Sequence, residues 1–403
     1  MCRIAIFHPT DPLGNVPGGI ESIIRGILKW SPPDLQYTLF GATSDAIARP
    51  VGREQPLPFA PGQSRFVPVT TVDSAGRRGF VPAIVRYMQA LRRRIGSGQC
   101  DRFDILDFHR VEPLWLFRND ARPKNIILHQ DMSAIRDENC DIMWRHAPWL
   151  YELVERPLLS HVDHIFAVRQ SAVARYRRSY PKRPDWVSFM PTWVDITVFS
   201  PAPSAEIRER LREALRRRLG ISDPEMKVLV TVGRLDKQKD PLLLINAFNE
   251  VLRSRRKLHL VLIGDGLLRS AVERTCVALG VRAAVSLLGV QPSTTIADVL
   301  RASDLFVLSS AYEGMPIAVL EALATGLPVV STNVGEIPSI VQDGINGAVC
   351  STRTVEALSE AMIRCLSALP SLSGDPCERS ATPYHPDKVL HLLYANHRQQ
   401  GQR

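Results

Sequence analysis

Residues 311–323 have the sequence AYEGMPIAVLEAL, and this stretch carries the clearest signal of fold and site in the chain. Pro316 suits the first residue of a helix, because its missing N–H needs no partner there. Glu313 then falls in the loop before the helix, and Glu321 lies just over one turn inside it. The free N–H groups and the positive dipole end of such a helix can receive a phosphate group.

The two acidic residues of this stretch are spaced to hold hydroxyl groups. A carboxylate accepts hydrogen bonds from vicinal hydroxyls, so Glu313 near a sugar and Glu321 near a ribose would fit a nucleotide sugar. A plainer interpretation makes Glu313 a partner of the helix dipole and Glu321 a surface acid. The apolar neighbours Val319, Leu320 and Leu323 make an exposed Glu321 less natural.

A second cluster of charged residues occupies positions 232–240, VGRLDKQKD. It follows a predicted strand and precedes a predicted helix, which is where doubly wound domains bind phosphates. Arg234 offers a planar fork of donors and Lys239 a mobile point charge, a combination suited to a diphosphate. The alternative is that a loop of a basic protein simply contains such residues.

Short apolar runs alternate with helical stretches along the chain, which predicts parallel sheets built from βα units. In the first half we expect strands at 3–7, 35–40, 104–108, 125–129 and 164–168, with helices at 20–30, 82–95 and 148–161. In the second half we expect strands at 228–232, 258–263, 285–288, 305–308 and 328–331. The pattern predicts an α/β protein with two doubly wound, Rossmann-like parallel-sheet domains facing across a cleft.

Prolines accumulate between residues 191 and 203, where the periodicity stops, and this predicts a linker. We expect a first domain over 1–198, a second over 199–384, and a C-terminal helix within 385–403 that crosses back to the first domain. Residues 204–219 predict a solvated amphipathic helix rich in arginine, with membrane contact as the alternative. Residues 370–386 are expected to form a loop.

The composition limits the class of protein. The 403 residues are 45% hydrophobic and 23% charged, as in globular proteins. The seven cysteines show no CxxC or Cys/His clustering, which argues against a disulfide framework and against a zinc site. Without a leader-like N-terminus or an apolar run of about 18 residues, a cytoplasmic location is expected. The net charge of +9 fits phosphorylated ligands or an anionic membrane, and no nucleic-acid-binding signature accompanies it.

The motifs taken in order are similar to those of a known enzyme family. Glu313 and Glu321, with seven residues between them, resemble the EX7E motif of family 4 of the retaining glycosyltransferases, which have the GT-B fold. The resemblance covers nearly the whole chain and includes Gly18-Gly19, the Gly-Arg-Leu segment with Lys239, Gly264-Asp265-Gly266, EGMP, residues 326–330 GLPVV, and Asn346-Gly347.

For the second domain, this resemblance implies a donor site. Arg234 and Lys239 should bind the donor pyrophosphate and stabilise charge on the leaving group. Glu321 should hold the ribose hydroxyls, and Glu313 should contact the transferred sugar. The backbone around Gly314, Met315, Pro316 and Leu320 should meet sugar and phosphate.

For the first domain, the resemblance implies contacts from three positions. Gly18 and Gly19 match a glycine loop that lets backbone approach the phosphates. His129 matches a histidine that reaches the donor sugar and the reaction centre, whereas the alternative is a satisfied core histidine. His109, which ends the preceding predicted strand, is a weaker candidate on the acceptor side.

The chain departs from the family pattern at three places. Asp240 stands where the family usually has glycine after the lysine, which puts the strength of the Lys239 contact in doubt. Thr192-Trp193 replaces the usual Asn-Gly of the linker. His129 is followed by Gln130 where an aspartate is common.

No Asp-x-Asp metal motif occurs, so we expect leaving-group charge to be met by Arg234, Lys239 and the helix N-terminus, without a metal or other cofactor. The resemblance implies retention of the anomeric configuration, with attack on the face from which the nucleotide leaves. A nicotinamide dehydrogenase is disfavoured because Arg269 stands at the third-glycine position after Gly264 and Gly266. A nucleoside-diphosphate-sugar epimerase and an inactive partner-binding homologue stay open as alternatives.

The expected partners are a UDP- or GDP-sugar donor and a glycan or lipid-linked acceptor, in surface or exopolysaccharide assembly. The base, the sugar and the acceptor are not specified by the motifs. Basic clusters in the first domain, at 92–94, 177–178 and 182–183, are expected to hold it peripherally against the inner, anionic face of a membrane.

Overall fold

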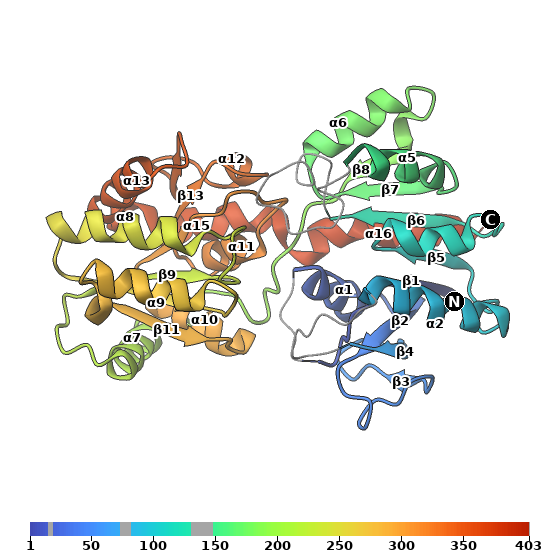
Figure 1. Cartoon of the computed structure of the whole chain (residues 1–403), viewed down its shortest axis with the longest axis horizontal. Helices are drawn as coiled ribbons and strands as arrows, with labels where there is room; N and C mark the ends of the chain where they lie inside the picture. Colours follow the sequence, from blue (N-terminus) through green and yellow to red (C-terminus); the bar gives the residue numbers. More distant parts are fainter. Residues whose placement is uncertain (15–18, 73–81, 130–147, 403) are drawn as a thin grey trace. The chain divides into compact units, whose positions relative to one another are not determined.

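The computed structural model describes residues 1–14, 19–72, 82–129 and 148–402, whose helices and strands are labelled in Figure 1. The chain divides into two units. The first contains the N-terminal part through Pro191 together with the segment from Pro386 onward, and the second contains Thr192–His385. Each unit has a mainly parallel sheet covered by helices on both faces, so the predicted α/β class with two Rossmann-like domains is confirmed.

The first unit is built on a sheet whose described strands run in the order β3-β4-β2-β1-β5-β6-β7-β8. All pair in parallel except β3, which is antiparallel to β4. The strands are β1 (Cys2–Phe7), β2 (Leu35–Thr43), β3 (Gln55–Pro56), β4 (Arg65–Thr71), β5 (Ile105–Phe108), β6 (Lys124–Leu128), β7 (His164–Ala167) and β8 (Val187–Phe189). The helices are α1 (Gly19–Lys29), α2 (Ala83–Gly96), α3 (Val111–Leu114), α5 (Pro148–Leu159), α6 (Gln170–Ser179) and α16 (Pro386–Gly401), with 3-10 turns η1 (Trp115–Phe117) and η3 (Pro184–Trp186).

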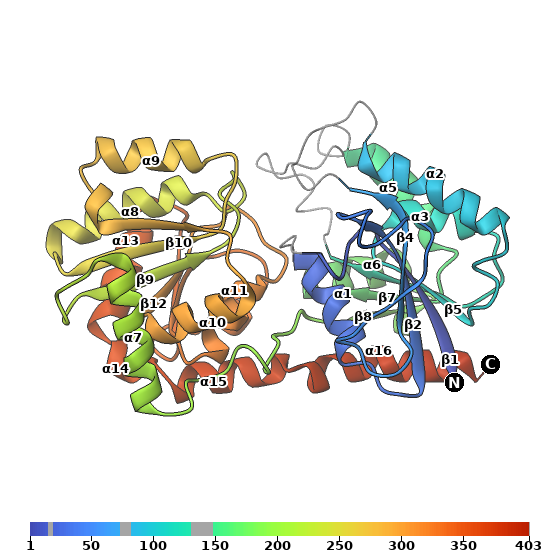
Figure 2. The ribbon, with the colours of Figure 1, turned by 90° about the horizontal axis from the view of Figure 1, so that it is seen from below.

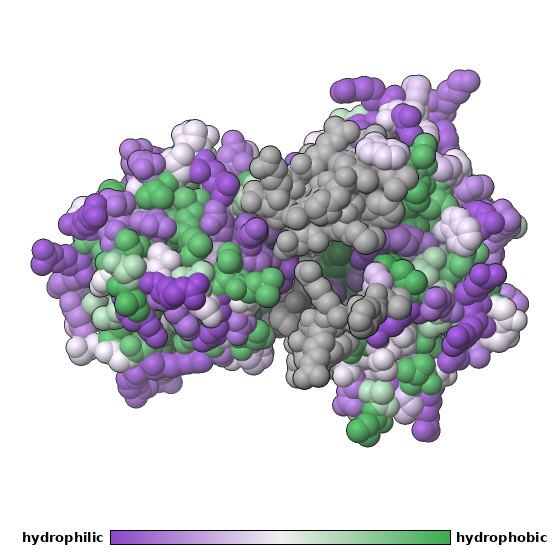
Figure 3. Space-filling view, viewed as in Figure 1, coloured by the Kyte–Doolittle hydropathy of each residue, from purple (hydrophilic) through white to green (hydrophobic). Residues whose placement is uncertain are grey.

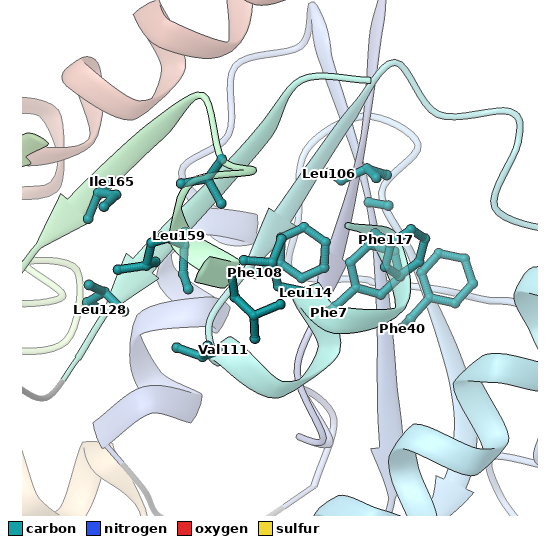
Figure 4. Packing of buried hydrophobic residues seen from close by; sticks show 14 of the residues in the cluster. Phe7, Phe40, Leu106, Phe108, Val111, Leu114, Phe117, Leu128, Leu159 and Ile165 are labelled. Carbon is teal, nitrogen blue, oxygen red and sulfur yellow. The ribbon is translucent and has the colours of Figure 1, made fainter. Parts of the chain in front are cut away.

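An aromatic cluster holds the centre of this sheet against the helices on one face. Phe7, Phe40, Phe108 and Phe117 are buried, and Figure 4 shows their rings packed together. The ring of Phe7 lies 5.3 Å from that of Phe40, 5.2 Å from that of Phe108 and 4.6 Å from that of Phe117, measured between centroids. Burying each such ring stabilises the fold by roughly 1.5–3 kcal/mol. Phe7 and Phe108 are the last residues of β1 and β5, so this cluster fixes where those strands end.

The C-terminal helix α16 lies with the first unit, on the face of the sheet opposite to α2, α3 and α5 (Figure 2). Tyr37 Oη and His397 Nδ1 are 2.8 Å apart, and the fully buried His397 Nε2 lies 2.8 Å from Asp107 Oδ2. The side chains of Gln400 and Asn125 exchange two hydrogen bonds, of 2.8 and 3.0 Å. These buried polar contacts bind the end of the chain to strands β2, β5 and β6.

The second unit has a sheet whose described strands are all parallel, in the order β11-β10-β9-β12-β13-β14. This is the 3-2-1-4-5-6 order of doubly wound nucleotide-binding domains. The strands are β9 (Lys227–Val232), β10 (Leu258–Ile263), β11 (Val285–Gly289), β12 (Leu305–Leu308), β13 (Val329–Thr332) and β14 (Gly347–Cys350). The helices are α7 (Ala205–Leu219), α8 (Pro241–Ser254), α9 (Arg269–Ala278), α10 (Ser293–Ala302), α11 (Ile317–Ala324), α12 (Ile337–Ile340), α13 (Val355–Ser367), α14 (Leu369–Leu372) and α15 (Asp375–Ala381), with 3-10 turns η4 (Arg282–Ala284) and η5 (Thr382–Tyr384).

Two apolar clusters lie on the two faces of the second sheet. One packs α8, α9 and α13 against it, and the other packs α7, α10, α11 and α15. Val194 and Phe199, within the predicted linker, are buried in the second of these clusters. Because β9 and β12 are central and adjacent while their following helices belong to opposite layers, the sheet has its topological switch point between them.

The predicted loop at 370–386 is wrong. This segment contains most of α14, all of α15, and η5, and it leads directly into α16. Its prolines lie in first turns, where a missing N–H costs no hydrogen bond. Leu372, Cys377 and Ala381 are buried, and their packing stabilises helices that the frequent prolines made hard to predict. Pro316 also differs slightly, because it caps helix α11 and the helix begins at Ile317.

The surface mixes polar and apolar residues, and Figure 3 shows hydrophilic and hydrophobic side chains interspersed over the visible face. Scattered apolar residues are normal on a folded protein. Within the described ranges, none of the helices combines the length and the apolar character needed to cross a membrane.

Candidate functional site

The charged cluster at 232–240 and the segment at 311–323 lie side by side in the second unit. Both follow central strands, β9 and β12, at the carboxyl edge of the sheet. The Ala311 N–H donates to the Gln238 carbonyl at 2.7 Å, and Gln238 Nε2 donates to the Tyr312 carbonyl at 3.3 Å. The two motifs therefore form one site at the switch point of the sheet, which is where such domains bind ligands.

Lys239 and Glu313 form the charged contact that joins the two motifs of this site. Lys239 Nζ donates to Glu313 Oε1 at 2.6 Å, and Ser310 Oγ donates to the same oxygen at 2.6 Å. The Glu313 side chain is 7% exposed and that of Lys239 21% exposed, so the pair is largely shielded from water. Ser309 Oγ donates to the Lys239 carbonyl at 2.9 Å and holds the backbone of the lysine in place. The lysine thus reaches the site with its charge balanced by a fixed carboxylate.

Arg234 is the more exposed of the two predicted cations. Its side chain is 60% exposed and lies 3.0 Å from Asp236 Oδ2, while its second terminal nitrogen donates to Gln238 Oε1 at 3.0 Å. Asp236 is buried and also accepts a hydrogen bond from the Lys239 N–H at 3.0 Å. Asp236 therefore orients both cations, and the guanidinium keeps free surface for an anion.

Two neighbouring loops close tightly against this site, and glycines make this possible. Gly264, which follows β10, has φ +129°, and a Cβ there would lie 2.0 Å from the Gly233 carbonyl oxygen. Gly335, after β13, has φ +57°, and a Cβ there would lie 2.2 Å from the Gly314 carbonyl oxygen. Only glycine fits at either position without moving backbone.

The start of helix α11 positions the predicted Gly314, Met315 and Pro316. The Gly314 carbonyl accepts from the Glu336 N–H at 3.1 Å. The buried Thr192, one of the departures from the family pattern, donates its hydroxyl to the Met315 carbonyl at 3.3 Å and its N–H to Met315 Sδ at 3.2 Å. Thr192 therefore supports the backbone just before α11, at a position where the family usually has asparagine.

Leu320 and Glu321 lie on helix α11. Leu320 is fully buried, so only its backbone is available for the predicted contact. Glu321 is partly exposed, yet desolvation of its carboxyl raises its pKa to about 7, with the nearby Asp195 carboxylate as the second cause. A carboxyl that ionises near neutrality, with its charge unfavourable in the free protein, is typical of ligand sites.

Asp240 shows why the usual glycine can be replaced. Its φ is +43°, in the left-handed region that glycine, asparagine and aspartate tolerate best. Its side chain caps helix α8 by accepting from the Leu243 N–H at 3.2 Å, and it forms an ion pair with Arg353. The carboxylate therefore accepts a hydrogen bond at the end of the helix and pairs with Arg353.

In the first unit, the structure brings His109 and His129 together. The two rings stack with centroids 5.1 Å apart, and His109 Nδ1 lies 2.9 Å from His129 Nε2. Burial lowers the pKa of His109 well below its usual value and that of His129 to about 3, with neighbouring His129 and His8 adding to the first and Arg110 to the second. Both rings are therefore neutral and act through hydrogen bonds.

The predicted glycine loop is only partly described. Gly18 lies outside the described residues. Gly19 is the first residue of α1, and none of the described atoms comes within 4 Å of the place where a Cβ would stand. The surrounding described protein therefore imposes no steric demand for glycine at position 19.

Three participants were missed from the sequence. Ser310 and Asp236 lie inside the two motifs and could have been found as polar residues directly after strands. His8 follows β1 and packs edge-on against His109, with ring centroids 6.3 Å apart. No motif marks His8, and only the strand order brings it to the other two histidines.

Comparison with known proteins finds a family model that matches part of the second unit. Residues 212–371 match the model of the family described as glycosyl transferases group 1. A D-inositol 3-phosphate glycosyltransferase from Segniliparus rotundus is 32% identical over 197 residues, which is 48% of this chain and 42% of that relative. The match therefore spans less than half of the relative's own length.

Two solved structures cover nearly the whole chain. Sucrose-phosphate synthase from Thermosynechococcus elongatus has a TM-score of 0.79 and 16% identity, over 99% of both chains. Anabaena HepE, solved in complex with UDP and glucose, has a TM-score of 0.73 and 16% identity, over 98% of this chain and 99% of that one. At this identity the likeness establishes the fold, which is that of the GT-B enzymes.

Proposed function

We propose that this protein is a retaining, metal-independent glycosyltransferase that uses a nucleotide diphosphate sugar. The proposal starts from the match of residues 212–371 to the model of the group 1 glycosyltransferases. The observation that carries the proposal is the Lys239–Glu313 pair at the switch point of the second sheet. In this pair, a cation that suits a diphosphate is hydrogen-bonded directly to a carboxylate that suits sugar hydroxyls.

The donor diphosphate would bind to Arg234, Lys239 and the free N–H groups at the start of α11. Two cations and a helix dipole supply positive potential where charge grows on the leaving phosphate. Within the described ranges, no group of three or more His, Cys, Asp or Glu side chains is arranged to hold a metal ion. Metal independence is tested by activity in chelator.

Glu321 would accept hydrogen bonds from the two ribose hydroxyls, and Glu313 would hold a hydroxyl of the transferred sugar. The backbone of Gly314, Met315 and Pro316 would meet the sugar and phosphate. The ribose hydroxyls would supply two hydrogen bonds to the desolvated Glu321 carboxylate, which favours nucleotide over free phosphate.

The acceptor hydroxyl would attack the anomeric carbon from the face that the nucleotide leaves, so that the configuration is retained. The bond from that carbon to the phosphate oxygen breaks as the new glycosidic bond forms. The acceptor proton would pass to the departing phosphate oxygen. His129 and the Gly18-Gly19 loop would contribute from the first unit, with neutral His129 binding a sugar hydroxyl.

The acceptor is proposed to be a glycan or a lipid-linked sugar, in surface or exopolysaccharide assembly, a role that rests on the family resemblance. A membrane-bound acceptor is supported by helices α2, α3 and α5, which cover one face of the first sheet (Figure 2). Trp149 and Leu153 of α5 are 67% and 66% exposed, and Arg92 and Arg93 of α2 are exposed. Exposed aromatic, aliphatic and basic side chains on the helices of one layer suit an anionic bilayer surface.

Sedimentation with vesicles containing anionic lipid at low salt tests the membrane contact. The double variant Trp149→Ser/Leu153→Ser should lose most vesicle binding. The matched control Ile47→Ser removes another strongly exposed apolar side chain and should bind as the wild type does. A wild type that ignores the vesicles would sink the membrane proposal, and equal binding by all three proteins would show that Trp149 and Leu153 do not make the contact. Neither result bears on the donor site.

The transferase proposal is tested by incubating the protein with UDP- and GDP-sugars and candidate acceptors in EDTA, and following the products by NMR. An α-linked product from an α-linked donor, formed in chelator, is the expected result. An inverted product or an absolute requirement for a divalent ion would contradict the proposal. Conversion of the donor sugar without any acceptor would favour the epimerase alternative.

A further inference from the structure

Three histidines form a row at the switch point of the first sheet. His8, His109 and His129 each follow directly after a strand, and those strands, β1, β5 and β6, are neighbours in the sheet. His8 and His109 are 4% and 3% exposed, and His129 is partly exposed. The row therefore occupies the position in its own sheet that the Lys239–Glu313 pair occupies in the other.

The contact between His109 and His129 links their protonation. A neutral imidazole has one N–H and one bare nitrogen, so a hydrogen bond between His109 Nδ1 and His129 Nε2 needs the proton on one side only. If His109 donates, His129 must carry its own proton on Nδ1; if His129 donates, its Nδ1 is bare. The state of His109 thus decides whether the other nitrogen of His129 is a donor or an acceptor.

That other nitrogen is available for a ligand. His129 Nδ1 is a buried atom without a hydrogen-bond partner among the described residues, as are His109 Nε2 and both ring nitrogens of His8. Buried polar atoms are normally paired, and leaving one unpaired is costly. Burial lowers the pKa of His8 and His109 well below their usual values, so the row offers neutral donors and acceptors and not positive charge. Neutral nitrogens of this kind suit a hydroxyl group.

We propose that His109 is a positioning residue, whose hydrogen bond fixes the ring orientation and the tautomer of His129 so that Nδ1 of His129 meets a sugar hydroxyl in one defined state. This inference rests on the proposed function, because it takes His129 to touch the substrate. His8 packs against the edge of His109 and limits its rotation, without a bond to His129 of its own.

Three variants separate the hydrogen bond from simple packing. His109→Phe keeps a stacked ring but removes Nδ1. His109→Asn places an amide near the position of Nδ1 and can restore the bond. His8→Phe makes the same ring replacement in the same row, at a residue that does not bond to His129, and is the matched control.

The first measurement is the 15N chemical shift of the His129 ring in histidine-labelled protein, assigned with His129→Gln. The wild type should show one dominant neutral tautomer, His109→Phe should show a mixture, and His109→Asn and His8→Phe should keep the wild-type pattern. An unchanged His129 spectrum in His109→Phe overturns the proposal, as does an equal change in His8→Phe.

The second measurement is the transfer reaction. His109→Phe should lower kcat by about 10- to 100-fold, as expected for a misplaced reacting-site group, with nucleotide affinity unchanged and with recovery to within about threefold in His109→Asn. A fully active His109→Phe would show that the positioning inference fails. A wild type without transferase activity would instead show that the proposed function fails, while the NMR arm still decides whether His109 sets the tautomer of His129.

Discussion

Lys239 Nζ lies 2.6 Å from Glu313 Oε1, across 74 positions of sequence, and joins the two motifs that were found separately in the chain. The contact explains how each of the two side chains is held in the site. The carboxylate keeps the lysine in place without a ligand, and the lysine is the charged partner of the shielded carboxylate. A diphosphate that takes over Lys239 would free Glu313 oxygen for a sugar hydroxyl.

Glu313→Gln should slow transfer without weakening nucleotide binding. The amide keeps the size of the side chain and can accept from Ser310 Oγ, but it removes the negative charge opposite Lys239. We expect kcat to fall by about 100-fold or more, in the range seen for removal of one electrostatic contact to a transition state. UDP affinity should stay equal or become tighter. Glu250→Gln, which breaks the exposed pair with Arg253 on α8, is the control and should leave both quantities unchanged.

Lys239→Ala should weaken UDP binding by about 10- to 100-fold, because a charge-assisted contact to the diphosphate is lost. Lys237→Ala removes an equal charge from an exposed side chain of the same loop and should change affinity by less than about threefold. The double variant Lys239→Ala/Glu313→Gln removes the unpaired carboxylate as well, and its affinity should stay weak. Equal losses in Lys237→Ala and Lys239→Ala would mean that only overall charge matters.

Asp240→Asn should tighten UDP binding modestly, by about two- to fivefold at low salt. Asparagine tolerates the left-handed backbone and can still cap α8, whereas it lacks the negative charge near Lys239 and Arg353. The gain should disappear at high salt, because it comes from a partly exposed charge. Isothermal titration at two salt concentrations measures both effects, and weaker binding by the variant would show that the Asp240–Arg353 pair supports the site.

The raised pKa of Glu321, about 7, gives nucleotide binding a pH dependence. If the ionised carboxylate accepts hydrogen bonds from the ribose hydroxyls, only protein with ionised Glu321 binds well. The fraction of protein in this state rises by about tenfold between pH 6 and pH 8. UDP should therefore bind more tightly at pH 8 than at pH 6 by up to that factor. Glu321→Gln, measured in the same buffers, removes the contribution of this group and leaves that of the phosphate itself. Parallel pH profiles for the two proteins would contradict the assignment.

The same group should affect stability with the opposite sign. Its folded-state pKa is raised above the ordinary value of 4.5, so its favourable contribution is present below that pH and is lost as pH rises through about 7. Glu321→Gln should therefore raise Tm relative to the wild type at pH 8 and not at pH 4.5. A thermal melt series without nucleotide measures the difference. A constant gap between the two proteins would mean that the carboxyl is not desolvated.

Regular strands and contiguous motifs could be predicted because the pattern of each lies within consecutive residues. Leu258–Ile263 and Leu305–Leu308 have the bounds that their apolar runs predict, since buried parallel strands leave no polar alternation. The strands β3, β4, β8 and β14 were not predicted. The strands β3 and β8 have only two and three residues, Pro68 lies inside β4, and β14 begins with a glycine. The helices at 369–384 were missed because proline conceals a first turn.

The residues of the candidate site could be proposed from the sequence, but the contacts between them could not. The sequence places Arg234, Lys239, Glu313 and Glu321 in loops or at a helix start, but only the order of strands brings Lys239 to Glu313. The same reason hides His8. Its partner strand β5 begins about a hundred positions later, and nothing local distinguishes it from a core histidine.

The second unit is proposed to bind a nucleotide diphosphate without a metal ion, and calorimetric titration tests this binding most directly. UDP, GDP and ADP would be titrated in EDTA into the wild type and into Glu321→Ala, with folding of both checked by a thermal melt. We expect the wild type to bind one nucleotide with micromolar affinity and Glu321→Ala to bind it at least about tenfold more weakly. No binding of any of the three by the folded wild type, or equal binding by both proteins, would contradict it.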